Sequence, residues 1–167
     1  MLSKKYILLN TVIAVFAFVF QYNSFNIFGS LNATPMFTLG FIIVLSMFCS
    51  ELSSFITGLA FGIITDAVAT TALGFNSIVL PLICFGVSLL SHYLFNNNIR
   101  SCAVISSAVS FVYFTVKFMI FYSSVNAKET MMYLMRTAIP SAIITAVFSV
   151  LLYLFEKRAF KDVQTLR

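Results

Sequence analysis

The stretch GLAFGIITDAVATTALGFN, residues 58–76, decides how this sequence folds. It opens with two glycines, Gly58 and Gly62, and places the carboxylate of Asp66 one turn further along an apolar run. The chain is 60% hydrophobic and 9% charged, so a charge inside such a run needs an explanation. At the centre of a membrane helix an ionised carboxylate costs about 2.5–3.5 kcal/mol. The stretch therefore predicts a membrane helix in which the acid has a partner.

The composition places the whole chain among integral membrane proteins. Its mean hydropathy is +1.01, and its 167 residues include 20 Phe but five acidic and ten basic side chains. A soluble domain carries about a quarter charged residues. No hydrophilic stretch is long enough to fold separately, so we expect one transmembrane domain over residues 1–167, all of it α-helical and embedded in the lipid bilayer.

Six apolar segments predict a bundle of about six transmembrane helices. The first follows basic residues, as a signal peptide does, but lacks a clean small-x-small cleavage site, so we expect a retained helix. The second is short, and three interpretations stay open: it crosses locally thin membrane, extends back through Thr34–Pro35, or re-enters. The segments are approximately Tyr6–Tyr22, Met36–Cys49, Leu52–Thr70, Ser77–Phe95, Ser101–Tyr122 and Ala138–Phe155.

The basic residues flank these segments, which indicates a role in topology and not in nucleic-acid binding. Six spans put both termini on the same side of the membrane. Loops on the cytoplasmic side are enriched in Lys and Arg, so the side with more of them is predicted to be cytoplasmic. That side, with both termini, receives Lys4, Lys5, Arg100, Lys157, Arg158, Lys161 and Arg167, and the other receives Lys128 and Arg136.

Small residues and Asp66 recur every four positions in the third segment, on one helix face. Ser54, Gly58 and Gly62 allow a second helix to approach closely. Such spacing is abundant in membrane helices, so ordinary helix packing is the simplest account of the glycines alone. The carboxylate of Asp66 lies on the same face and needs a partner there.

Lys117, in the fifth segment, is the candidate partner for Asp66. Asp66 lies about 21 Å beyond Leu52 along its helix and Lys117 about 22 Å beyond Cys102, so their depths match. Two interpretations stay open. The first is a buried ion pair between the two residues. In the second, Lys117 extends its ammonium to the membrane surface, and Asp66 caps the next turn near Gly74.

Residue patterns typical of catalysis do not stand out. An intramembrane aspartic protease requires two embedded carboxylates, whereas Asp66 stands alone within the predicted spans and Asp162 lies in the tail. His92 is the single histidine and has no recognisable nucleophile motif. The three cysteines lack metal-site spacing, and no nucleotide fingerprint occurs. We therefore expect no enzymatic activity, no cofactor and no metal site.

Three motifs together resemble the rod-shape-determining protein MreD family. Pro35 opens the second segment, and GLAFGIITDAVATTALGFNS carries Gly74 and Asn76 after the glycines and the acid. The third motif is AIPSAIITAVFSVLLYLF, residues 138–155, with Pro140 near its start.

The resemblance implies a fold and a role. The fold would be similar to the substrate-binding subunits of energy-coupling-factor transporters. The role would be that of a non-catalytic scaffold or regulator of cell elongation and peptidoglycan synthesis in the bacterial cytoplasmic (inner) membrane. The implied direct partner is an MreC-like bitopic membrane protein. The indirect partners are an MreB-like filament, a RodA-like glycosyltransferase and a class B penicillin-binding protein.

Two alternative functions stay open. The chain would be a vitamin-capturing transporter subunit if Asp66, Lys117 and Arg136 lined an outward pocket, although such a site normally shows more polar and aromatic contacts. It would be a small membrane carrier if one buried carboxylate coupled transport to protons.

Overall fold

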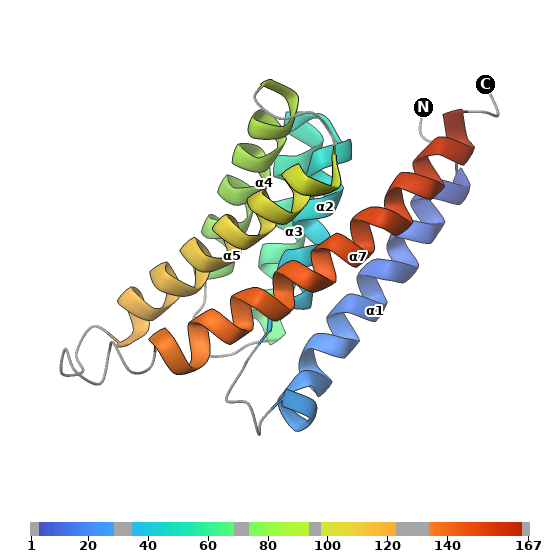
Figure 1. Cartoon of the computed structure of the whole chain (residues 1–167). Coiled ribbons are helices and arrows are strands. Elements are labelled where there is room, and N and C mark those ends of the chain that lie inside the picture. Colours follow the sequence, from blue (N-terminus) through green and yellow to red (C-terminus); the bar gives the residue numbers. More distant parts are fainter. Residues whose placement is uncertain (1–3, 29–34, 69–73, 94–97, 123–133, 165–167) are drawn as a thin grey trace.

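The computed structural model describes residues 4–28, 35–68, 74–93, 98–122 and 134–164, and their regular structure is entirely helical (Figure 1). Within these ranges four stretches are long and apolar enough to cross a membrane, which confirms the expected helical membrane protein: Glu51–Val68, Phe75–Tyr93, Ile99–Ile120 and Arg136–Arg158. The helices are α1 (Lys4–Phe28), α2 (Phe37–Phe48), α3 (Glu51–Val68), α4 (Phe75–Tyr93), α5 (Ile99–Tyr122) and α7 (Ile139–Gln164), with a π-helical turn η2 (Leu134–Ala138) before the last.

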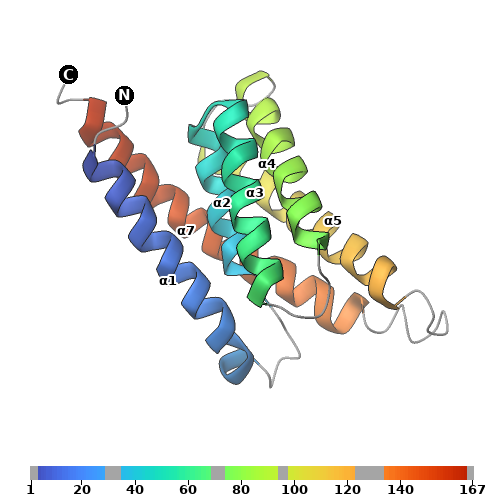
Figure 2. The same ribbon diagram turned by 180° about the vertical axis from the view of Figure 1, so that it is seen from behind.

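Successive helices run in alternating directions (Figures 1 and 2). The start of α1 and the end of α7 lie at the same end of the molecule, together with the ends of α2 and α4. This arrangement agrees with the prediction that both termini lie on one side of the membrane. Which side faces the cytoplasm stays a prediction.

Helix α2 is the centre of the bundle. Its sequence, FTLGFIIVLSMF, has no polar face, and a helix that is apolar all round is stable where other helices surround it. All its residues from Phe37 to Met47 are buried, and it contacts α1, α3, α4, α5 and α7. The 12-residue helix is about 18 Å long, which is less than a hydrocarbon core of about 30 Å. It begins at Phe37, so of the three open interpretations the one in which this helix extends back through Thr34–Pro35 is wrong.

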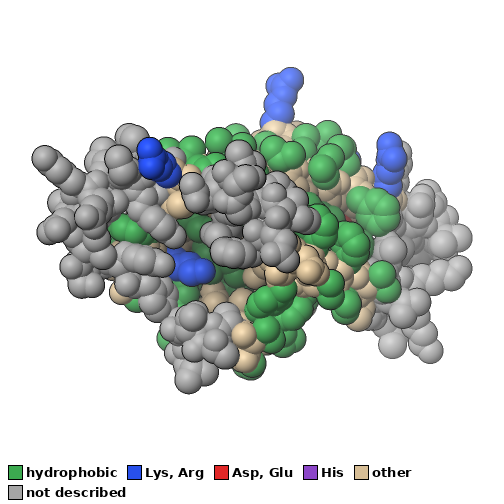
Figure 3. Space-filling model, turned by 90° about the horizontal axis from the view of Figure 1, so that it is seen from below, with side chains coloured by type: hydrophobic (Ala, Val, Ile, Leu, Met, Phe, Trp, Pro, Cys, Tyr) green, Lys and Arg blue, Asp and Glu red, His purple; other side chains and the backbone are tan. Residues whose placement is uncertain are grey.

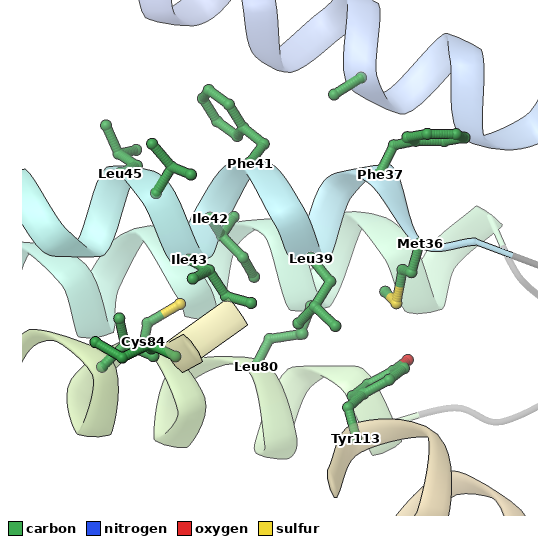
Figure 4. Close-up of a cluster of buried hydrophobic side chains, with 14 of the residues drawn as sticks. Met36, Phe37, Leu39, Phe41, Ile42, Ile43, Leu45, Leu80, Cys84 and Tyr113 are labelled. Atoms are coloured by element: carbon green, nitrogen blue, oxygen red, sulfur yellow. The ribbon is translucent and has the colours of Figure 1, made fainter. Parts of the chain in front are cut away.

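The side chains of α2 reach its neighbours in opposite directions (Figure 4). Phe37 and Phe41 point toward α1, whereas Leu39 and Ile43 point toward Leu80 and Cys84 of α4 (Figure 4). These residues are all at most 3% exposed and belong to one hydrophobic cluster. The core is therefore built around the shortest apolar helix.

The peripheral helices present apolar side chains outward, as lipid-facing surfaces do. Leu52, Ile78 and Met119 are each more than 60% exposed, and hydrophobic atoms cover much of the described surface seen from below (Figure 3). Inside the bundle, several hydroxyl side chains donate to backbone carbonyls of their own helix. Thr145 and Ser149, for example, donate to carbonyls one turn earlier in α7, at 2.8 Å each, so they cost little in an apolar core.

Candidate functional site

The two glycines of α3 lie directly against α4. A Cβ atom built on Gly58 would lie 2.7 Å from Sγ of Cys84 and 2.8 Å from Cα of Pro81. A Cβ on Gly62 would lie 2.6 Å from the carbonyl oxygen of Asn76. Backbone atoms cannot move away as a flexible side chain does, so this seam accepts no side chain at Gly62. The absence of Cβ atoms is what lets α3 and α4 approach so closely.

Asp66, one turn beyond Gly62, caps the start of α4. Its Oδ1 accepts hydrogen bonds from the backbone N–H of Asn76 (3.1 Å) and from Nδ2 of Asn76 (2.8 Å). Its Oδ2 accepts from the backbone N–H and from Oγ of Ser77, both at 2.7 Å. The first N–H groups of a helix have no partner inside the helix, and the positive end of the helix dipole favours an anion. The carboxylate, which is 5% exposed, therefore meets its hydrogen-bonding needs at the α4 N-terminus.

Gly74 makes this cap possible, because the chain must turn sharply between α3 and α4. Its φ is +97°, a conformation that glycine adopts without the steric penalty of a Cβ atom. The turn brings Asn76 and Ser77 back over the end of α3.

Tyr113 extends the cap to a third helix. Its Oη donates to Oδ1 of Asn76 at 2.7 Å, and its side chain is 1% exposed. Asn76 thus donates to Asp66 with its amide nitrogen and accepts from Tyr113 with its amide oxygen. We call Asp66, Asn76, Ser77 and Tyr113 the polar cluster; it joins α3, α4 and α5 through hydrogen bonds in an otherwise apolar region.

Lys117 and Asp66 are not brought together. Lys117 is exposed on α5, and in the part of the chain that the structure describes no ion pair links it to Asp66. The predicted ion pair is therefore wrong. Two residues at the same depth along their helices are not necessarily neighbours. Helix α3 packs mainly on α4, and the backbone N–H groups of Asn76 and Ser77 in α4 donate to the Asp66 carboxylate. The alternative interpretation, a cap near Gly74, describes the observed contacts.

The other predicted residues lie at helix ends. Pro35 is buried two residues before α2, and Pro140 is the second residue of α7, directly after η2. His92 and Arg136 are exposed, and the hydrogen bonds of Asp66 go to Asn76 and Ser77. Among the described residues no group of three or more His, Cys, Asp or Glu side chains could hold a metal ion.

Sequence reasoning missed three polar residues. Gln21 of α1 caps α2: its Oε1 accepts from the backbone N–H of Thr38 at 3.0 Å and from Oγ1 of Thr38 at 2.6 Å. Tyr113 looked like one more aromatic residue in an apolar helix. Glu156 directly follows the last predicted apolar segment, and it is 1% exposed.

These features define a class of protein: a multi-pass helical membrane protein, with a close α3–α4 seam capped by a buried carboxylate. The family model for rod shape-determining protein MreD matches residues 2–159, so this chain belongs to the MreD family. The resemblance noted in the sequence is thereby confirmed. No curated protein and no solved structure matches the chain.

Proposed function

We propose that this chain serves rod shape determination as a non-catalytic scaffold or regulator of the bacterial cell-elongation complex. The observation that carries the proposal is the family match over residues 2–159. The MreD family consists of shape-determining membrane proteins, and the chain has the apolar helices that such a protein needs.

The contacts of Asp66 support a structural role for it. A proton carrier or a ligand site needs a carboxylate with free acceptor positions, whereas Asp66 accepts four hydrogen bonds from its own chain. Such a carboxylate stabilises the arrangement of α3, α4 and α5 on which a scaffold depends. This favours the scaffold over the carrier and the transporter subunit.

In the proposed complex the chain binds an MreC-like bitopic protein directly. Through it, the chain is connected to an MreB-like filament and to a peptidoglycan synthase pair, a RodA-like glycosyltransferase with a class B penicillin-binding protein. The chain lies in the bacterial cytoplasmic membrane with both termini in the cytoplasm.

Orientation is tested with single cysteines in a background without Cys49, Cys84 and Cys102. Asn23→Cys, near the end of α1, should react with an impermeant thiol reagent in intact cells, and Asn98→Cys, at the start of α5, should not. Both positions are exposed, so access to the reagent decides the result. Labelling of Asn98→Cys in intact cells would contradict the predicted orientation and place the start of α5 outside the cell.

The function is tested by depletion of the protein in its rod-shaped host. Cells should widen or become round, the synthase should lose its ordered distribution, and affinity purification of the chain should recover the MreC-like protein. Re-expression of the unaltered chain is the control and should restore the rod. Normal shape together with a requirement for a vitamin would reject the scaffold and favour the transporter subunit.

A further inference from the structure

A groove of about 720 Å³ opens on the outer surface between α5 and α7. These two helices lie side by side and contact each other along the bundle (Figure 1). Four small residues line the floor of the groove, because their side chains leave space between the two helices. Four large apolar residues, each at least 41% exposed, flank the groove. The small residues are Ala103, Ser107, Ala108 and Ala142, and the large ones are Val104, Phe111, Ile139 and Ile143.

A cation, Arg100, lies one helical turn before the groove-lining residue Val104 of α5. Arg100 is exposed in the first turn of α5, and positions 100, 104, 107 and 111 lie on the same helix face. Phe111 lies about 16 Å from Arg100 along the helix axis. One leaflet of a membrane has a hydrocarbon thickness of about 15 Å. Measured from Arg100, the α5 wall of the groove is therefore about as long as one leaflet is thick.

We propose that this groove is a binding site for an anionic phospholipid. An acyl chain lies along the small residues of the groove, and Arg100 holds the phosphate of the headgroup. Guanidinium groups bind phosphate through paired hydrogen bonds, and basic sites between transmembrane helices bind anionic headgroups. The lining residues offer an apolar surface to the chain, with Ser107 as the one hydroxyl among them.

Charge favours a lipid over a partner's transmembrane helix at this groove. The Arg100 end is the one predicted to be cytoplasmic, and transmembrane helices carry Lys and Arg at their cytoplasmic flank. Such a flank would be repelled by Arg100, whereas a phosphate is attracted. The proposal concerns lipid binding and does not rest on the role in cell shape.

Native mass spectrometry of the full chain in detergent tests the site. Phosphatidylglycerol and phosphatidylcholine with identical acyl chains are titrated in parallel. We expect phosphatidylglycerol to bind about fivefold more tightly, which is the effect of one basic residue at a membrane surface. Arg100→Gln should abolish that preference, whereas Arg136→Gln, an exposed arginine at the opposite end, should keep it.

A second pair of variants tests the groove itself. Ala108→Leu fills the hollow from an exposed position and should weaken the binding of both lipids, whereas Ala60→Leu, exposed on α3, should leave binding unchanged. Equal affinities of the unaltered chain for the two lipids would overturn the proposal. So would equal losses in both arginine variants, or unchanged binding in Ala108→Leu.

Discussion

Helices α2 and α4 both begin inside the apolar bundle, and each is capped by a side chain of the preceding helix. At α2 the cap is the neutral amide of Gln21, whose oxygen accepts two hydrogen bonds from Thr38. At α4 the cap is the carboxylate of Asp66, which accepts four hydrogen bonds from Asn76 and Ser77. The N–H groups at a helix start are therefore satisfied by a neutral side chain at α2 and by a charged one at α4.

The surroundings of the two helix starts explain the difference. Helix α2 is enclosed by five other helices, so its position is held by packing on every side. Helix α3 packs on α4 and α2 and presents much of its surface outward. With fewer neighbours, the α3–α4 pair depends on a seam without Cβ atoms and on charge-assisted hydrogen bonds, which are about twice as strong as neutral ones. The comparison teaches that the buried charge strengthens the closely packed α3–α4 pair, whose two helices each have fewer helix neighbours than α2.

The largest effect is expected where the seam has no room. Gly62→Ala should lower the free energy of unfolding by about 3 kcal/mol, the upper range for overpacking, because the new Cβ meets backbone atoms of α4. Gly86→Ala is the matched control: a Cβ there meets nothing within 4 Å, so stability should stay equal or rise by up to about 1 kcal/mol. Unfolding in mixed micelles, followed by circular dichroism, measures both. Similar values for the two variants would contradict a tight seam.

Loss of the charged cap comes next. Asp66→Ala should cost about 2–3 kcal/mol in unfolding free energy, because buried donors of Asn76 and Ser77 lose their acceptor. Asp66→Asn keeps one oxygen and should lose roughly half as much. If the Asp66→Ala variant unfolds at the same denaturant concentration as the unaltered chain, the cap does not stabilise the packing of α3 on α4.

The neutral cap should matter less. Gln21→Leu retains apolar bulk but removes the acceptor for Thr38, and should cost about 1 kcal/mol in the same measurement. The comparison between the two helix starts depends on this order. A loss larger than that of Asp66→Ala would show that α2, and not α4, depends more on its cap.

The link from the cap to α5 should be worth about as much as one neutral hydrogen bond. Tyr113→Phe removes the hydroxyl that donates to Asn76 and should cost about 1 kcal/mol. Tyr93→Phe is the control, since Tyr93 is 76% exposed, and should change stability by less than about 0.5 kcal/mol. Equal effects of the two changes on the free energy of unfolding would contradict a stabilising role for the Tyr113–Asn76 hydrogen bond.

The smallest effect is expected for Lys117. In a double-mutant cycle of Asp66→Asn with Lys117→Met, the two changes should add within about 0.5 kcal/mol, because the residues share no contact. A coupling energy above about 1 kcal/mol would instead support an ion pair between Asp66 and Lys117.

The sequence by itself determined the class of protein and the need for a partner at Asp66. Both follow from local pattern, since apolar length sets the membrane-spanning helices and a carboxylate in an apolar run requires hydrogen bonds. The spacing of Gly58, Gly62 and Asp66 also placed them on one helix face before any neighbour was known. The motifs that indicated the MreD family are likewise features of the chain alone.

The tertiary structure decided which groups meet. Depth along a helix follows from residue number, but adjacency depends on how helices are arranged, so the sequence left an ion pair with Lys117 and a cap near Gly74 equally open. The same reason hid Gln21 and Tyr113, whose hydrogen bonds join residues 17 and 37 positions apart. It also hid the central place of α2: a short apolar helix looks alike in sequence whether lipid or other helices surround it, and only packing distinguishes the two.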